Sequence, residues 1–518
     1  MALAQQDAWV YFTDKPNATA LLSNPISILT QAAIDRKANH SVAIDERDVP
    51  VHEPYIALVK ASTGITYKAK SKWFNAVHVR GSEADINDLM TTHNFVDEIV
   101  FADSNLNLRT GSTQNKFQLE ASLTNFTYGT TQNQVEMLKV DDLHIANYTG
   151  EGVVVAVVDA GFPNVNTMAG FERLRAVGNL MGGYDFVDRT EDVYNSTVSD
   201  HGTKVLSTMA GFVEDQYVGT APDATYYLFR TEDAPTENPV EESYWVEAVE
   251  RADSLGVHIV NSSLGYVDFD NSNYDHTRAQ LNGTTAYISK GANIAFEKGL
   301  IIVNSAGNSG ASGVVAPADA AGVLSIAAVD ENGDYAWFSS QGSAFQPTHK
   351  PDVAARGSGS YVINSSNQIT QSNGTSFSSP ILAGGIASLV QALPNATNAE
   401  IMSFVRESAS QYSNPDYFLG YGIPDFQMAL TLGLKQQSAK QFEFEIFPNP
   451  VHSNLFIKFP IVTEAVSVSI HNILGVLVYE DELESMRPIH TEALSKGLYL
   501  LTIHIENQKS IPFKLIKK

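Results

Sequence analysis

The sequence contains no cysteine, and this absence excludes several kinds of chemistry at once. Without thiols the chain can form no disulfide bond, no thiolate metal site and no cysteine nucleophile. Stability must therefore come from packing, to which bound ions could add. Hydrophobic residues make up 43% of the chain and charged residues 18%, a balance typical of a folded globular protein and not of a disordered one.

Basic residues and long apolar runs are also scarce. The chain has 33 Lys and Arg against 58 Asp and Glu, a formal net charge of -25. Such a charge repels phosphate backbones and anionic lipids, so we expect no nucleic-acid partner and no membrane-surface role. Apolar runs such as Val153–Val158 have strand length, far below the roughly 18 residues of a membrane span, so we expect a soluble protein without one.

The length of 518 residues suggests roughly three domains, and the residue pattern changes accordingly along the chain. Residues 7–103 alternate helical and strand patterns, including a helix near Ile26–Ala38, which predicts a small α+β domain. Residues 104–134 are rich in Ser, Thr, Asn, Gln and Gly, as in a linker. Residues 135–434 predict an α/β fold with a parallel sheet flanked by helices, and residues 442–518 predict a small β-sandwich. The strands of the parallel sheet are predicted from five apolar runs: Val153–Val158, Thr225–Phe229, Val257–Val260, Leu300–Val303 and Val323–Val329.

Small and polar residues follow three of the apolar runs in the predicted parallel sheet. In open α/β sheets, ligands bind outside the carboxyl ends of the strands, so these residues are candidates for a site. The three segments are Asp159–Gly161, Asn261–Gly265 and Asn304–Gly310.

Two reactive side chains lie near the starts of predicted helices. His201 precedes the helical pattern Val205–Met209, and Ser376 lies in the polar stretch that opens the apolar helix Ile381–Leu393. We expect Pro380 in the first turn of that helix, where backbone amides have no partner within the helix.

Asp159, His201 and Ser376 together provide the three parts of an activated nucleophile. A serine hydroxyl attacks a carbonyl only when a base takes its proton, and a buried carboxylate orients that base and stabilises its charged form. The negative oxygen formed in the reaction needs hydrogen-bond donors, for which Asn308 and the backbone amide of Ser376 are candidates.

These residues resemble the subtilisin-like serine peptidases over about residues 135–434, in that family's order of Asp, His and Ser. The matching segments are Val155–Asp159, Asp200–Thr203, Ser305–Asn308 and Gly374–Pro380. The resemblance implies a subtilisin-like fold and a serine endopeptidase with Asp159, His201 and Ser376 as catalytic residues. It also implies that Asn308 contributes to the oxyanion hole.

The same resemblance implies how a polypeptide substrate binds. An extended chain would add as a strand beside Ser263, Leu264 and Gly265. A pocket for the side chain before the scissile bond would be walled by these residues and by Ser305, Ala306 and Gly307. Because the walls are small, we expect a large apolar or aromatic side chain to enter.

The acidic loop Tyr266–Asp275 departs from the family pattern. Its oxygens at alternate positions could hold calcium, but it lacks the helix-flanked calcium-loop pattern. We favour a solvated loop that shapes the cleft, and we expect that no metal ion or other cofactor is required.

Residues 7–103 resemble the inhibitory propeptides of this family, with Ala76–Val79 and Val96–Val100 as sheet strands. Such a domain would assist folding of the parallel core and block the cleft until the chain is cut in the linker 104–134. The alternative is an unrelated adhesive domain.

Residues 442–518 resemble the C-terminal sorting domain of the bacterial type IX secretion system. The matching segments are Phe447–Val451, Asn472–Gly475, Lys496–Leu500 and Lys514–Lys518. This resemblance implies export through the outer membrane of a Gram-negative bacterium, followed by release or attachment to the cell surface. The secretion machinery would then be a partner of this region.

Two other functions compete with the secreted endopeptidase. One is a surface-binding protein on an inactive peptidase scaffold, which would not need all four of Asp159, His201, Asn308 and Ser376. The other is an acid-active peptidase with Glu in place of the histidine, which His201-Gly202-Thr203 disfavours.

Overall fold

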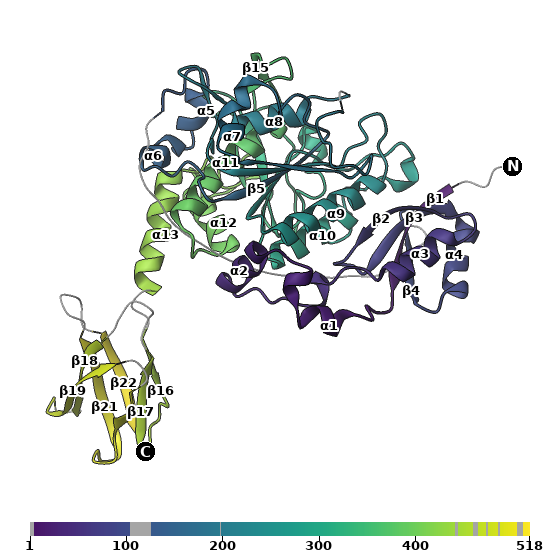
Figure 1. Cartoon of the computed structure of the whole chain (residues 1–518). Helices are drawn as coiled ribbons and strands as arrows, with labels where there is room; N and C mark the ends of the chain where they lie inside the picture. The colour runs from purple at the N-terminus through teal and green to yellow at the C-terminus, as the bar shows by residue number, and fades with distance from the viewer. Residues whose placement is uncertain are drawn as a thin grey trace. The chain divides into compact units, whose positions relative to one another are not determined.

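The computed structural model divides into two compact units, residues 1–431 and 432–518 (Figure 1). It describes residues 5–103, 126–196, 198–440, 444–458, 465–472, 475–484, 487–504 and 511–518. Most of the predicted linker, residues 104–125, lies outside these ranges, as do Ile473 and Leu474 of the segment Asn472–Gly475. The predicted end of the linker at residue 134 is wrong, because Thr131 and Gln134 are buried, the Thr131 hydroxyl donates to the carbonyl of Val218, and a helix begins at Gln132.

The N-terminal part of the first unit is an antiparallel sheet of four strands in the order β2-β3-β1-β4. The strands are β1 (Gln5–Phe12), β2 (Thr66–Ser71), β3 (Ala76–Ser82) and β4 (Val96–Phe101), and two helices, α3 (Glu53–Ala61) and α4 (Glu83–Thr92), accompany them. Helix α4 begins after Ser82, whose hydroxyl accepts a hydrogen bond from the amide of Asp85. The predicted strands Ala76–Val79 and Val96–Val100 are confirmed.

An additional segment lies between β1 and α3. It holds α1 (Ala18–Leu22), α2 (Gln31–Asn39) and two short 3-10 turns, Pro25–Ser27 and Glu46–Asp48. The predicted helix Ile26–Ala38 therefore begins too early, because α2 begins at Gln31. Thr30 has an extended backbone and caps α2 by accepting from the amide of Ala33, so the helix begins only after it.

The core of the central region, residues 135–434, is a parallel sheet of seven strands in the order β13-β12-β11-β10-β5-β9-β6. All five predicted apolar runs are strands, and two strands were not predicted, β6 and β13. Strand β6 forms one edge and contains two glycines, while β13 forms the other edge and spans four residues, so neither has a long apolar run. The strands are β5 (Val154–Asp159), β6 (Leu180–Asp185), β9 (Thr225–Arg230), β10 (Ile259–Ser262), β11 (Ile301–Ser305), β12 (Val323–Val329) and β13 (Val353–Arg356).

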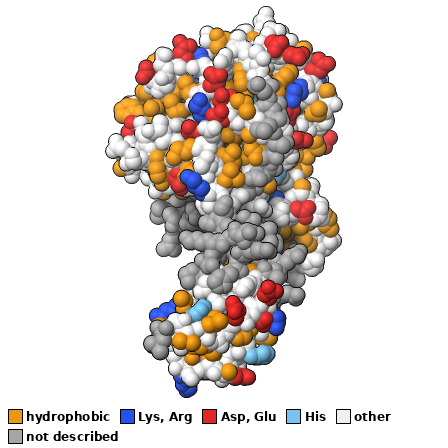
Figure 2. Space-filling view, turned by 90° about the vertical axis from the view of Figure 1, so that its left-hand side faces the viewer, with side chains coloured by type: hydrophobic (Ala, Val, Ile, Leu, Met, Phe, Trp, Pro, Cys, Tyr) orange, Lys and Arg blue, Asp and Glu red, His pale blue; other side chains and the backbone are white. Residues whose placement is uncertain are grey.

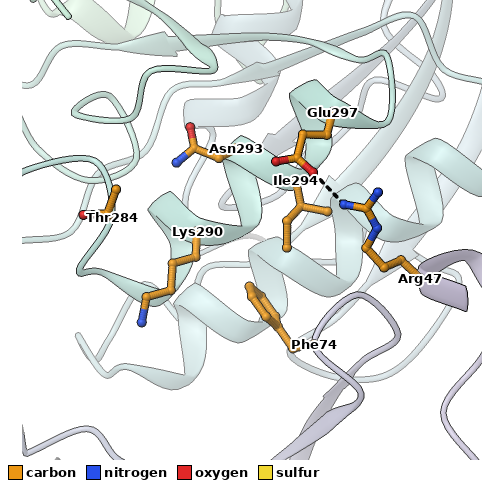
Figure 3. A pocket seen from close by; sticks show the side chains of 7 residues that line it. All are labelled: Arg47, Phe74, Thr284, Lys290, Asn293, Ile294 and Glu297. Atoms are coloured by element: carbon orange, nitrogen blue, oxygen red, sulfur yellow. Dashed lines mark hydrogen bonds and ion pairs between the residues drawn. The ribbon is translucent and has the colours of Figure 1, made fainter. Parts of the chain in front are cut away.

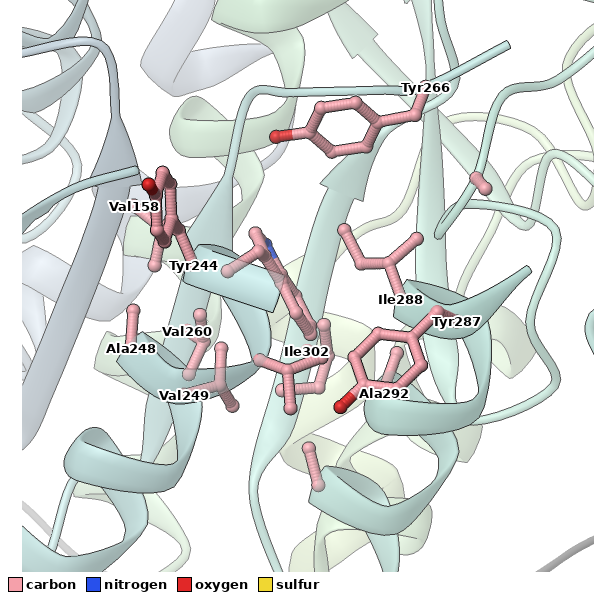
Figure 4. Packing of buried hydrophobic residues seen from close by; sticks show 14 of the residues in the cluster. Val158, Tyr244, Ala248, Val249, Val260, Tyr266, Tyr287, Ile288, Ala292 and Ile302 are labelled. Carbon is pink, nitrogen blue, oxygen red and sulfur yellow. The ribbon is translucent and has the colours of Figure 1, made fainter. Parts of the chain in front are cut away.

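Helices α9 (Val240–Leu255) and α10 (Tyr287–Glu297) pack side by side against this sheet. Figure 4 shows Val158, Val260 and Ile302 of the strands facing Val249 of α9 and Ile288 of α10. The core helix α11 (Thr375–Ala392) contacts β10 to β13, and it also contacts α8 (His201–Ala210). Nearly every residue of α11 is buried, because sheet and helices surround it.

Helix α11 begins six residues earlier than the sequence pattern predicted. The expectation that Pro380 occupies the first turn is wrong, because Pro380 lies inside the helix. Proline has no amide hydrogen, so the carbonyl of Ser376, four residues before it, lacks its helical donor.

Shorter elements complete the first unit. They are α5 (Gln132–Glu136), α6 (Val140–Ile145), α7 (Glu172–Ala176), β7 (Phe212–Val213), β8 (Tyr217–Val218), β14 (Ser360–Ile363), β15 (Ile369–Ser372) and α12 (Asn398–Glu407); helix α13 (Phe426–Lys440) runs into the second unit.

The second unit contains two antiparallel sheets that share one apolar core, as predicted for a β-sandwich. One sheet contains β16 (Glu445–Phe447), β17 (Asn454–Lys458) and β20 (Ile489–His490). The other has the order β19-β18-β21-β22 and consists of β18 (Ala465–Asn472), β19 (Leu477–Glu484), β21 (Gly497–His504) and β22 (Ile511–Lys517).

Over the described ranges, no helix is both long enough and apolar enough to cross a membrane. On the face seen in Figure 2, acidic and basic side chains are scattered among apolar ones.

Candidate active site

Asp159 is the last residue of β5, and its side chain is fully buried. Its Oδ1 accepts hydrogen bonds from the amide of Ala160 at 2.7 Å and from Nδ1 of His201 at 2.8 Å. Because an ionised carboxylate can only accept, the imidazole proton must lie on Nδ1. The opposite nitrogen of His201, Nε2, is therefore an acceptor and can take a proton.

His201 is the first residue of α8, and the next residue brings this helix close to β5. A Cβ atom at Gly202 would lie 2.5 Å from the carbonyl oxygen of Gly161, so only glycine allows this approach. The His201 side chain is 31% exposed, whereas its partner Asp159 is inaccessible. Burial lowers the pKa of His201, but the adjacent Asp159 carboxylate outweighs it, and the net pKa is raised above its usual value.

Ser376 is the second residue of α11 and is 9% exposed. Within the described residues, its hydroxyl makes one long hydrogen bond, 3.4 Å to the carbonyl oxygen of Ser263, and none to His201. The rings of His201 and Phe377, the residue after Ser376, lie 5.8 Å apart. Hydrogen bonds between a nucleophile and its base are often long or open when no substrate is bound, so this geometry does not exclude Ser376 as a nucleophile.

Asn308 lies just beyond the end of β11 and is exposed. Its side-chain amide group is oriented by Thr375. Its Oδ1 accepts from both the amide and the hydroxyl of Thr375, at 2.9 and 3.0 Å. Both Thr375 groups can donate, so the oxygen of the Asn308 amide must face them. The Nδ2 donor therefore faces away from Thr375. Thr375 itself was not predicted from the sequence.

The predicted substrate strand and pocket walls lie next to each other. Strands β10 and β11 pair with Ser262 opposite Asn304, which brings Ser263–Gly265 alongside Ser305–Gly307. The Asn304 side chain donates to the carbonyl of Leu264 at 2.9 Å, and Gly265 is exposed. The side chain of Val315 lies against both glycines: a Cβ atom added at Gly265 would be 2.0 Å from it, and one added at Gly307 would be 2.9 Å from it. Val315 was not predicted from the sequence.

Two of the three carboxylates of the acidic loop Tyr266–Asp275 accept hydrogen bonds from backbone amides. Asp275 accepts from the amide of Phe269 at 2.8 Å, and Asp270 accepts from the amide of Glu237 at 3.3 Å. In the part of the chain that the structure describes, no three His, Asp or Glu side chains are grouped as metal ligands.

Glu232 accepts a hydrogen bond from the hydroxyl of Tyr266, the first residue of this loop, and lies near enough to Asp159 for the two carboxyl groups to interact. Burial raises the pKa of Glu232 to about 8, and the neighbouring Glu237 and Asp159 carboxylates add to this rise. Its surroundings therefore disfavour the charged form of Glu232.

Comparison with known proteins places these features in a family. The profile of the subtilase family matches residues 150–422. The chain belongs to the subtilase family. The profile described as the peptidase S8 propeptide domain of Bacteroidota matches residues 7–119 of this subtilase, and that of a secretion system C-terminal sorting domain matches residues 445–518.

Curated relatives of this subtilase include two Bacillus enzymes. Subtilisin DY of Bacillus licheniformis is 27% identical over 299 residues, which cover 57% of this chain and 97% of that protein. Alkaline elastase YaB of a Bacillus species is 29% identical over 282 residues, 54% of this chain and 65% of that protein. Among solved structures, MycP1 of Mycobacterium smegmatis has a TM-score of 0.47 and 22% identity, covering 62% and 91% of the two chains.

Membership of the subtilase family and the similarity to subtilisins identify this protein as a serine endopeptidase. Its propeptide and sorting domains make it a precursor that is secreted or displayed on the outer cell surface.

Proposed function

We propose that this subtilase hydrolyses peptide bonds with Asp159, His201 and Ser376 as its catalytic triad and Asn308 as an oxyanion donor. The 2.8 Å hydrogen bond between Asp159 and His201 Nδ1 carries the proposal, because it leaves Nε2 as the base. The orientation of Asn308 by Thr375 supports it, because this leaves Nδ2 as a free donor.

In the first step, the Ser376 hydroxyl leaves the carbonyl of Ser263 and attacks the scissile carbonyl carbon while His201 Nε2 takes its proton. Asp159 stabilises the resulting imidazolium. Asn308 Nδ2 and the backbone amide of Ser376, which has no partner in the first turn of α11, donate to the oxyanion. His201 then protonates the leaving amine, and water hydrolyses the acyl-enzyme by the same route.

The substrate binds in an extended conformation along Ser263, Leu264 and Gly265, through main-chain hydrogen bonds. The side chain before the scissile bond enters between this segment and Ser305–Gly307. The small size of these residues supports a broad preference for apolar side chains at that position. Cleavage restricted to the position after Lys or Arg, in a peptide library, would contradict this pocket.

We further propose that the enzyme cuts its own precursor within the linker 104–134 and that the type IX secretion machinery recognises residues 442–518. The stretch is rich in Ser, Thr, Asn, Gln and Gly, and exposed polar segments are the usual sites of limited proteolysis. Thr131 and Gln134 are buried, so we expect the cut before them.

Comparison of the wild-type precursor with Ser376→Ala tests the catalytic assignment. The variant lacks one oxygen, so it should fold, keep residues 7–103 covalently attached and show no activity on casein. Intact-mass measurement and a casein assay, on proteins purified without other peptidases, provide the two readouts. Equal trimming of both proteins would exclude self-processing, and equal casein activity would remove Ser376 from the mechanism.

We also propose that catalysis needs no metal ion. Dialysis against EDTA should leave kcat on a short peptide unchanged. A loss of activity that added calcium restores would contradict this.

A further inference from the structure

The four-stranded sheet of the second unit, β19-β18-β21-β22, has one face in the core of this unit and one face toward solvent (Figure 1). Side chains alternate between the two faces along a strand, and Tyr499, Leu501 and Ile503 of β21 lie in the core. Leu498 and Leu500 of the same strand therefore lie on the outer face, where they are 44% and 48% exposed. A solvated sheet face is normally polar, so these two leucines are unusual there.

The strand register places further apolar side chains beside these two leucines. Leu498 pairs with Ile516 of β22, which is 37% exposed. Leu500 pairs with His471 of β18, and His471 pairs in turn with Leu477 of β19, which is 46% exposed. Paired residues lie on the same side of a sheet, so these side chains form one group. We call Leu477, Leu498, Leu500 and Ile516 the outer apolar face.

Charged side chains on the same side of the sheet limit what can cover the outer apolar face. Lys514 pairs with Leu500 and makes no ion pair with any described residue of this unit. Glu480 and Glu482 of β19 are exposed at the edge of the sheet. Carboxylates at this edge repel anionic lipid, whereas a protein can meet both signs of charge with opposite charges of its own. The outer apolar face is therefore suited to a protein partner and not to a membrane surface.

The strands that carry the outer apolar face lie within residues 445–518, which match a secretion system C-terminal sorting domain. A protein that recognises this domain needs a surface that stays exposed after folding. The inner face of the sheet is not available, because its side chains form the core of the unit. Protein interfaces have an apolar centre and a polar rim, and the outer apolar face, flanked by Lys514 and Glu480, has both.

We propose that the sorting domain binds a protein component of the secretion machinery through the outer apolar face. The proposal rests on the proposed function, which makes this machinery the partner of residues 442–518. The matching surface of the partner is apolar at its centre, with a carboxylate opposite Lys514 and a basic group opposite Glu480. Leu500 is the central contact, because its neighbours in the sheet are His471 on one side and Lys514 on the other.

Secretion of the full-length chain by a Bacteroidota host with an active type IX system tests the proposal. Leu500→Glu should lower the secreted fraction about tenfold and leave the precursor in the periplasm, because an unpaired carboxylate would be buried in the interface. Leu500→Met keeps an apolar side chain of similar volume and should be secreted like the wild type. Immunoblots of the medium, the cell surface and the periplasm measure the distribution.

Thr502→Glu is the matched control for position. Thr502 lies on the same strand and the same side as Leu500, two residues further along, but outside the outer apolar face. This variant should be secreted like the wild type. Limited proteolysis of each periplasmic precursor checks that the second unit is folded. Leu498→Gln, a neutral change on the same face, gives the same test if Leu500→Glu unfolds the unit.

The remaining outcomes overturn either this proposal or the proposed function. Normal secretion of Leu500→Glu, or equal retention of Leu500→Glu and Thr502→Glu, would show that the outer apolar face is not the recognition surface. Dimerisation of the purified precursor that Leu500→Glu abolishes would assign the face to a second copy, and binding to phosphatidylglycerol vesicles that the variant loses would assign it to lipid. Secretion of a chain that lacks residues 442–518 would instead overturn the proposed function.

Discussion

The hydroxyl of Ser263 donates a 2.8 Å hydrogen bond to the carbonyl oxygen of Ser376. In a regular helix that carbonyl would accept from the amide four residues later, but residue 380 is proline. Ser263 supplies the missing donor, and so connects the proposed substrate strand to the backbone of the proposed nucleophile. Both residues are buried, which makes an unpaired carbonyl costly at this position.

Ser263→Ala removes this donor while leaving the main chain of the substrate strand unchanged. We expect the start of α11 to relax and kcat to fall about fivefold, the equivalent of about 1 kcal/mol, with KM nearly constant. Ser263→Thr keeps a hydroxyl and should retain most of the activity. Steady-state kinetics on a peptide substrate measures both variants, and equal losses in the two would show that the hydrogen bond is not responsible.

Asn308→Leu removes the proposed oxyanion donor. We expect kcat to fall about 100- to 1,000-fold with little change in KM, because the amide stabilises the transition state more than the ground state. Circular dichroism should show an intact fold. Ser309→Ala, an exposed neighbour, serves as the control and should retain wild-type kinetics, whereas an unchanged rate in Asn308→Leu would remove Asn308 from the mechanism.

The pH dependence of kcat/KM should have an acidic limb set by His201. The active base is neutral, and Asp159 raises its pKa, so activity should fall as the pH drops through a value above about 6.5. Asp159→Asn removes the carboxylate that raises the pKa of His201, whereas burial, which lowers this pKa, remains. The acidic limb should therefore move to lower pH. The maximal rate should fall about 10,000-fold, since the tautomer is no longer fixed. A limb that stays in place would argue against control of His201 by Asp159.

The segment between β1 and α3 anchors the N-terminal domain to the peptidase core through buried ion pairs. Lys37 lies 2.8 Å from Asp253, and Arg36 contacts the same carboxylate. Lys298 at the end of α10 lies 2.8 Å from Asp48. A further pair, Arg47 with Glu297 at 2.5 Å, lies beside a pocket of about 290 Å³ and is partly exposed (Figure 3).

Asp253→Asn should weaken retention of residues 7–103 after the linker is cut, because Arg36 would remain buried without its anion and Lys37 would keep only Asp48, at 3.2 Å. Loss of one partner from a buried pair costs about 3 kcal/mol, so affinity should fall on the order of 100-fold. Size-exclusion chromatography of the processed protein measures co-elution of the two parts. Glu297→Gln is the matched control, since Arg47 is 38% exposed and such pairs contribute at most about 1 kcal/mol. Equal release in both variants would contradict a role for burial.

Several features followed from short stretches of sequence. The five buried strands of the sheet were predicted because continuous Val, Ile and Leu runs bury both faces of a parallel strand. The candidate residues Asp159, His201, Asn308 and Ser376 were found because each lies at the end of a predicted element. Strand β6 was missed because it is only partly buried, and strand β13 because its apolar run is short. The start of α2 was missed because burial there is also partial.

Sequence alone thus determined the five central strands of the sheet, the family resemblance and the residues able to carry the chemistry, because each of these is encoded within a few neighbouring positions. Only the tertiary structure showed that Pro380 lies inside α11, where Ser263, 113 residues before Ser376, provides the absent donor. It alone showed that Thr375 orients Asn308 and that Asp253 pairs with Arg36, 217 residues away. Hydrogen bonds and ion pairs of this kind depend on distance in space, which periodicity and propensity along the chain do not contain.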